Sequence, residues 1–261
     1  MRIDFFEEFP VIENLQKAVL INHSSLVYLA ARSIEEFDHL AHMLHTLNPK
    51  LQAGYWPILK ESYWISPFSY TTELENLKGE LSKRNSSLEV LLDLELPILS
   101  PVLFFKNFHS FKRNRDLIKD ILLLAIDTNI RFSTAEYPFV ADMGRFIMWA
   151  AGISYSTKFY GHERIIMSYS SIARHAFRPL NIDMRNWLRR SLRIGVKRDN
   201  SIAIGLGTIA TGALGNEPIL SLHELRSDLE FCSELKCKRV VVFRLGGLNE
   251  EYVSVISSFS N

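Results

Sequence analysis

The chain has 261 residues, of which 47% are hydrophobic and 23% are charged, and its formal net charge at pH 7 is +1. This length is enough for one large domain with its own hydrophobic core. A balance of charge so close to zero gives no indication of nucleic acid as a partner, and we expect none. The two cysteines, Cys232 and Cys237, are spaced like neither a zinc site nor a redox pair.

The amino-terminal residues do not resemble a signal peptide, because Arg2 and Asp4 interrupt the apolar run at once. The most apolar helical stretch, residues 146–153, is far shorter than the ~20 residues that a bilayer span requires. The sequence therefore predicts a cytoplasmic protein without a transmembrane segment.

Short runs rich in β-branched and aromatic residues alternate with longer helical patterns along the whole chain. Helices are predicted after Ser33, where Glu36 completes a capping box, and over residues 72–81, 117–125 and 222–235. Eight runs predict β-strands, at residues 3–9, 25–30, 52–56, 89–95, 131–136, 164–169, 202–207 and 239–245.

Strands that alternate with helices favour a parallel sheet, and eight such units favour closure into a barrel. The main alternative is a doubly wound open sheet, which usually has a glycine-rich turn after its first strand. Here that turn is Glu7-Glu8-Phe9-Pro10 and contains no glycine. We therefore predict a single (β/α)8 TIM barrel, of the α/β class, that spans residues 1–261.

Two carboxylates lie at the end of the fourth predicted strand, where barrel enzymes carry their chemistry. Asp93 and Glu95 are two residues apart, so both side chains face the barrel axis, while Leu92 and Leu94 face the helices. Burying carboxylates is costly unless they are paired, protonated or bound to a cation. Glu136, and Glu7 or Glu8, could join this cluster, and arginines that neutralise it are the structural alternative.

Close carboxylates repel, so the pKa of one rises while the other stays ionised. A neutral carboxyl beside an ionised one is what general acid catalysis requires. We expect Glu95 and Asp93 to be catalytic residues, with Glu136 as a further candidate.

The motif Asp93-x-Glu95 on strand 4, together with Met167-x-Tyr169 on strand 6, resembles the chitinase-type family 18 glycoside hydrolases. The resemblance implies that Glu95 protonates the glycosidic oxygen and that Asp93 orients the N-acetyl group of the substrate, which acts as the nucleophile. It also implies that Tyr169 forms a hydrogen bond with the same N-acetyl group. No metal or other cofactor is then expected.

An aromatic-rich segment follows the third strand and supports a sugar ligand. Six aromatic side chains occur in sixteen residues, beginning with Tyr55 and Trp56. Aromatic faces provide large contact areas at a low entropic cost. We predict that Tyr55 and Trp56, together with Glu7, bind the substrate; simple packing over the barrel mouth is the alternative.

A competing hypothesis is a phosphosugar lyase or isomerase. Barrels often bind phosphate with the loops after strands 7 and 8, and both loops contain glycines here, including Gly246 and Gly247. Backbone N–H groups at glycines approach anions closely, and Arg244 could add a bidentate contact. The carboxylates would then be acid–base groups or Mg²⁺ ligands.

A third hypothesis is a non-catalytic barrel that binds a partner, or a second copy of itself, through a basic face. Basic side chains are concentrated between Arg174 and Arg198, around an apolar side that includes Trp187. The histidines at positions 39, 42 and 45 lack a carboxylate or cysteine at matching spacing, so no metal site is predicted there.

Overall fold

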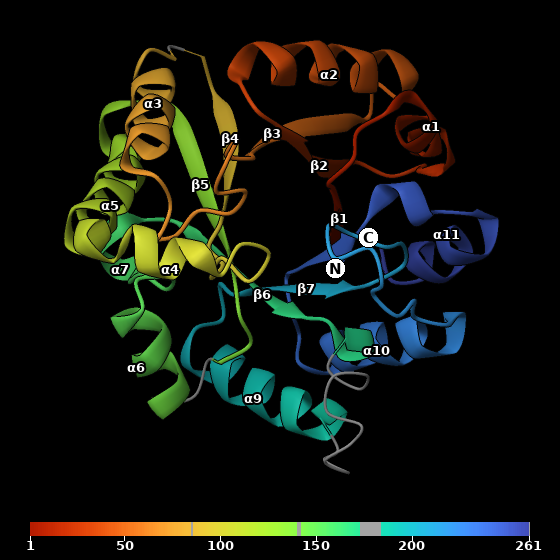
Figure 1. The fold of residues 1–261 in the computed structure, drawn as a ribbon. Helices are drawn as coiled ribbons and strands as arrows, with labels where there is room; N and C mark the ends of the chain where they lie inside the picture. The colour runs from red at the N-terminus through yellow and green to blue at the C-terminus, as the bar shows by residue number, and fades with distance from the viewer. Residues whose placement is uncertain (85, 140–141, 173–183, 261) are drawn as a thin grey trace.

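The computed structural model describes residues 1–84, 86–139, 142–172 and 184–260. Its eight strands are parallel and form a closed barrel in chain order, with β8 paired to β1 (Figure 1). The predicted (β/α)8 barrel is confirmed, and each observed strand end lies within two residues of its predicted position. The strands are β1 (Arg2–Glu7), β2 (Ser25–Ala31), β3 (Leu51–Pro57), β4 (Leu88–Asp93), β5 (Ile130–Glu136), β6 (Glu163–Ser168), β7 (Ala203–Gly207) and β8 (Arg239–Phe243).

Helices surround the barrel on its outside (Figure 1). Ser33 caps the second helix as predicted, by accepting a hydrogen bond from the Glu36 N–H, but the Glu36 carboxylate accepts from Arg32 rather than from Ser33. The helices are α1 (Ile12–Leu15), η1 (Gln16–Leu20), α2 (Ile34–Leu47), α3 (Thr71–Ser82), α4 (Val102–Lys106), η2 (Phe108–Ser110), α5 (Phe111–Asp127), α6 (Asp142–Ala150), α7 (Thr157–Tyr160), α9 (Met184–Arg198), α10 (Leu222–Glu234), η4 (Leu245–Gly247) and α11 (Glu250–Ser257).

The apolar side chains form two separate layers, because neighbouring residues of a strand face opposite sides of the sheet. Leu91 belongs to the inner cluster, inside the barrel, whereas Leu92 and Leu94 belong to the outer cluster beneath the helices. Gly54 makes room for a ring in the inner layer, since a β-carbon there would lie 2.6 Å from the ring of Tyr28. The predicted inward direction of Asp93 follows from its position two residues after Leu91.

The amino-terminal end of the barrel is closed by charged side chains that pair with one another. Arg239 binds Asp4 at 2.6 Å and also contacts Glu163. The hydroxyl of the fully buried Tyr28 accepts a hydrogen bond from Arg239 and donates one to Ser133. These interactions fill the barrel interior at this end.

Two arginines of the basic face pack against the neighbouring helix. Arg185 and Arg189 of α9 both form ion pairs with Asp228 of α10, at 2.7 and 3.3 Å. Arg174 and Arg178 lie outside the described residues. Within the described ranges, no helix is long and apolar enough to cross a bilayer.

Candidate active site

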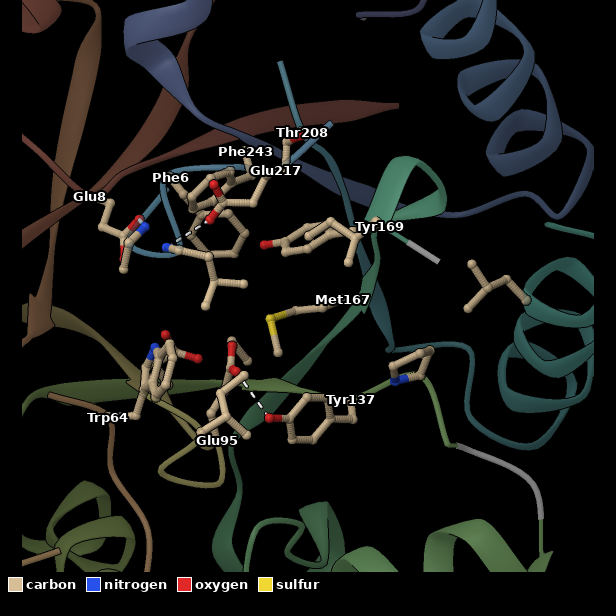
Figure 2. A pocket seen from close by; sticks show the side chains of 18 of the residues that line it. Phe6, Glu8, Trp64, Glu95, Tyr137, Met167, Tyr169, Thr208, Glu217 and Phe243 are labelled. Atoms are coloured by element: carbon tan, nitrogen blue, oxygen red, sulfur yellow. Dashed lines mark hydrogen bonds between the residues drawn. The ribbon is translucent and has the colours of Figure 1, made fainter. Parts of the chain in front are cut away.

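A cavity of about 490 Å³ opens at the carboxyl-terminal end of the barrel (Figure 2). This volume is within the range typical of small-molecule sites. Most of the strands contribute, with the loops that follow them. The side chains around it include Phe6, Glu8, Trp56, Trp64, Asp93, Glu95, Tyr137, Met167, Tyr169, Trp187, Leu214, Glu217 and Phe243.

Asp93 is the last residue of β4 and lines this cavity. Its side chain is 4% exposed, and its Oδ1 atom has no hydrogen-bond partner in the described part of the chain. Burial raises the pKa of Asp93 well above its usual range, and the nearby carboxylates of Glu95 and Glu8 raise it further. The arginine partner that would make this carboxylate structural is not found among the described residues.

Glu95 follows a short extension of β4, in which Leu94 bridges to Ile65. The Tyr137 hydroxyl donates a hydrogen bond of 3.1 Å to Glu95 Oε2 (Figure 2). Burial raises the pKa of Glu95 to about 7, and Glu8 also raises it, while the Tyr137 bond lowers it. A carboxyl with a pKa near neutrality has the protonation behaviour that a general acid needs.

Tyr169 follows β6 and points into the same cavity, with Met167 beside it (Figure 2). Its ring packs on Phe243, with 5.5 Å between the ring centroids. A β-carbon at Gly207 would lie 3.2 Å from the Tyr169 ring, so the glycine provides part of the space. No other described residue forms a hydrogen bond with the Tyr169 hydroxyl, which leaves it available to a ligand.

Trp56 and Trp64 both line the cavity, but Tyr55 does not. Tyr55 belongs to the outer cluster, and its ring lies 5.3 Å from Phe37 of α2. Tyr55 and Trp56 are consecutive on a strand and face opposite sides, so the structure does not support the predicted role of Tyr55 in substrate binding. The buried indole Nε1 of Trp56 has no partner in the described part of the chain.

Glu7 and Arg244 also lie on the outer side of the barrel wall. Arg244 Nη1 binds Glu7 Oε1 at 2.9 Å, and the Gly246 N–H donates to Glu7 Oε2 at 2.6 Å. The Gly247 N–H donates to the Arg244 carbonyl. These four residues link β1 to η4 outside the cavity, so the structure does not support their predicted role in substrate binding.

Glu136, the further catalytic candidate, also faces away from the cavity. It binds Arg164 at 2.7 Å and accepts a hydrogen bond from Thr134, on the outer side of β5. Ala135, its neighbour, faces inward and lines the cavity. Glu136 therefore does not join Asp93 and Glu95, and its predicted catalytic role is not supported.

Two further carboxylates line the cavity: Glu8, which the sequence offered only as an alternative to Glu7, and Glu217, which it did not indicate. Glu8 accepts hydrogen bonds from the Tyr63 hydroxyl at 2.6 Å and the Ala213 N–H at 2.9 Å. Glu217 Oε1 accepts a bond of 3.0 Å from the Leu214 N–H. Alternation from the inward-facing Phe6 would have identified Glu8, but no pattern identifies Glu217, which belongs to an irregular loop.

Comparisons with known proteins establish which fold this chain shares. No family model and no curated protein sequence matches this chain. A GH18 chitinase from Pseudoalteromonas aurantia superposes with a TM-score of 0.61, at 10% identity, over 99% of this chain and 100% of that one. The chain shares its fold with family 18 chitinases.

Two further solved structures show how far this fold extends. The glycoside hydrolase domain of PgaB (BpsB) from Bordetella bronchiseptica has a TM-score of 0.54 and 11% identity, over 97% of this chain and 95% of that one. A xylose isomerase domain protein from Planctomyces limnophilus has a TM-score of 0.55 and 8% identity, over 99% and 94%. Such low identities establish the barrel and leave the chemistry to be argued from the site.

The charge of the site is unfavourable to a phosphorylated ligand. The cavity lining contains four carboxylates and, among the described residues, no lysine, arginine or histidine. The backbone N–H groups expected to hold phosphate instead bind carboxylates, as Ala213 does with Glu8 and Gly246 with Glu7. Nor do three potential metal-ligating side chains converge anywhere in the described ranges.

Proposed function

We propose that this protein is a glycoside hydrolase-like enzyme that acts on a carbohydrate, with Glu95 as its general acid. The observation that carries the proposal is a pair of inward-facing carboxylates, Asp93 and Glu95, that no cation neutralises in the described structure. They lie in a cavity lined by Trp56 and Trp64, whose rings provide apolar area for the faces of sugar rings.

The proposed reaction begins with transfer of the Glu95 proton to the glycosidic oxygen, as the bond from this oxygen to the anomeric carbon breaks. The carbonyl oxygen of the substrate's N-acetyl group forms a bond to the same carbon, as the resemblance implies. Water then attacks this carbon, the bond between the carbon and the acetyl oxygen breaks, and the water gives a proton to Glu95, which restores the acid. Asp93 and the Tyr169 hydroxyl hold the N-acetyl group during both steps.

The environment of each group supports its proposed role. The raised pKa of Glu95 keeps a proton on the acid near neutral pH. Asp93 Oδ1 has no partner among the described residues, so it is available to accept the amide N–H of an acetamido group. Burial leaves these contacts in a poorly solvated site, where electrostatic interactions are strong.

The test compares the wild type with Glu95→Gln on a panel of N-acetylated and plain glycosides. Loss of a general acid lowers rates by about 10²–10⁴-fold, and we expect a loss of this size in kcat. Glu89→Gln is the matched control, because Glu89 lies on the same strand at the opposite end of the barrel, paired with Arg131. Equal rates for wild type and Glu95→Gln on every hydrolysed substrate would refute the proposal.

A further inference from the structure

The most exposed aromatic side chains of the described chain are concentrated on the short helices α4, η2, α6 and α7. Every described phenylalanine, tyrosine or tryptophan that is at least half exposed belongs to this set, called the aromatic surface below: Phe105, Phe108, Phe146, Trp149 and Phe159. At about 150–250 Å² for each aromatic side chain, their exposed fractions correspond to roughly 500–900 Å² in total. The largest apolar patch of a monomeric protein is typically about 300–600 Å² and is often functional, so an exposure of this size indicates a binding surface.

The start of α5 brings these helices together. The helix η2 ends at Ser110, and α5 begins at the next residue, Phe111. One turn later, the guanidinium carbon of Arg115 lies 4.7 Å from the centre of the Trp149 ring on α6, and α7 also contacts α5. Figure 1 shows α4, α6 and α7 on the same side of the barrel, so the aromatic surface occupies one region of the molecule.

The segments that carry the aromatic surface have basic side chains and no acidic ones. Residues 98–115 and 144–160 contain no aspartate or glutamate, although the chain as a whole is nearly neutral. Lys106 and Lys158 are both exposed, and they follow Phe105 and precede Phe159 directly. The basic side chains in these segments are Lys106, Lys112, Arg113, Arg115, Arg145 and Lys158. Even with the Glu75 carboxylate that pairs with Arg113, the region has a net positive charge where its aromatic rings are exposed.

An anionic lipid bilayer fits this combination better than a second copy of the chain does. A symmetric contact between two copies would bring the same basic side chains together, and they would repel one another. At a bilayer, apolar side chains enter the boundary between headgroups and acyl chains, while lysine and arginine bind the anionic headgroups. Val102 and Ile147, which are also at least half exposed, add aliphatic area that base stacking on a nucleic acid would not use.

The aromatic surface is continuous with the mouth of the cavity through the segment after β4. Ile98 lines the cavity and is also exposed to solvent. Leu99 and Val102 continue the exposed apolar side chains from Ile98 toward Phe105. Docking through this surface would therefore hold the cavity close to the lipid headgroups.

We propose that the aromatic surface docks this protein onto an anionic lipid bilayer. The aromatic rings lie in the interfacial layer of the bilayer, and Lys106 and Lys158 bind the phosphate groups of the lipids. This peripheral binding requires no membrane-spanning helix. It also requires no turnover, so it stands or falls independently of the proposed glycosidase function.

The test measures co-flotation of the full chain with vesicles of phosphatidylcholine alone, and of phosphatidylcholine with about 30% phosphatidylglycerol. We expect the wild type to bind the anionic vesicles at least about tenfold more tightly, and to dissociate at high salt because screening weakens the headgroup contacts. Phe105→Ser/Phe159→Ser removes two rings that are 84% and 80% exposed, and should weaken this binding at least about tenfold. Lys106→Gln/Lys158→Gln should weaken it by a similar factor, on anionic vesicles only.

Matched controls remove the same kinds of side chain elsewhere. Ile126→Ser alters a side chain that is 74% exposed near the far end of α5. Lys83→Gln/Lys238→Gln removes two exposed charges outside the segments that carry the aromatic surface. Both controls should bind like the wild type, and so should Glu95→Gln.

A fluorescence measurement distinguishes a bilayer from a protein partner. Brominated lipids should quench the tryptophan fluorescence of the wild type, and Trp149→Phe should remove most of this quenching, because Trp149 is the tryptophan of the aromatic surface. Absence of binding to anionic vesicles, or equal binding by wild type and Phe105→Ser/Phe159→Ser, would overturn the proposal. Self-association of the wild type that this variant abolishes, without binding to vesicles, would identify a second copy as the occupant and would overturn it as well.

Discussion

The two ends of this barrel differ in whether their buried acidic side chains are paired with a cation. At the amino-terminal end, Arg239 binds Asp4 and Glu163, and the interior is closed. At the carboxyl-terminal end, Asp93 and Glu95 face a cavity, and no cation in the described structure pairs with either. Both ends contain inward-facing acidic residues on strands of the same sheet, so the difference comes from their partners rather than from their positions.

The comparison separates acids that hold the fold from acids that are available for chemistry. Removing one partner of a buried ion pair strongly destabilises the fold, because the remaining charge is left without compensation. A buried acid without a partner already carries that cost, so its presence is best explained by a ligand or a reaction. The predictions below test this separation, beginning with the largest expected effect on stability.

Replacing the cation of the closed end should cause the largest loss. In Arg239→Met, the Asp4 carboxylate keeps its backbone donor from Leu26 and its ion pair with the half-exposed Arg2, but it loses its buried cation. We expect the free energy of unfolding to fall by about 3–5 kcal/mol, the usual cost of breaking a buried pair. Urea unfolding followed by tryptophan fluorescence measures it, and a change below about 1 kcal/mol would contradict the structural role of this end.

Glu136 provides a second test, because it is a buried acid on the outer side of the wall. Glu136→Gln keeps an oxygen acceptor for Arg164 but removes the charge. We expect a loss of about 1–3 kcal/mol in unfolding free energy, in line with a charge-assisted hydrogen bond. In the folded variant, kcat should stay within about twofold of wild type. A loss of kcat comparable to that of Glu95→Gln would instead support a catalytic role for Glu136.

The barrel could be predicted from the sequence because each strand is locally encoded. Eight apolar runs that alternate with helical patterns indicate the architecture, and alternation on β4 correctly separates Asp93 from Leu92. The same rule, applied at the other strand ends, would have placed Tyr55, Glu136, Glu7 and Arg244 on the outer side. Those residues were proposed for their chemistry alone, without counting from an inward-facing neighbour such as Trp56, Ala135 or Phe6.

The remainder of the site depends on tertiary structure that no local pattern encodes. Glu217 lies in a loop without regular structure, and only the folded chain brings it beside Glu8, more than two hundred residues away. The glycines after β7 and β8 illustrate the same limit. Their composition suggested an anion site, but the N–H groups at Ala213 and Gly246 are already bound to carboxylates of the chain.

Asp93→Asn should have the opposite sign from the variants at the closed end. The amide is neutral, so it removes the cost of burying a charge while keeping nearly the same shape. We expect the unfolding free energy at pH 8 to be unchanged or higher by about 1 kcal/mol, even though kcat falls. A loss as large as that of Arg239→Met would mean that Asp93 holds the fold together.

The smallest expected effect is the change in unfolding free energy with pH, and it reports specifically on the buried acids Asp93 and Glu95. Since burial raises the pKa of Glu95 from 4.5 to about 7 and raises that of Asp93 as well, the folded state binds more protons than the unfolded state between these values. Stability from these groups is therefore complete below about pH 4.5 and is lost as the pH rises through 7.

The double variant Asp93→Asn/Glu95→Gln should remove most of this slope. We expect the difference in unfolding free energy between the double variant and the wild type to grow in favour of the variant from pH 5 to pH 8, measured by urea unfolding at each pH. Part of the wild-type slope should persist, because burial also raises the pKa of Glu8. Glu89→Gln, at the other end of β4, should unfold with the wild-type slope. If the double variant also kept that slope, Asp93 and Glu95 would not carry the raised pKa values, and the contrast between the two ends would rest on geometry alone.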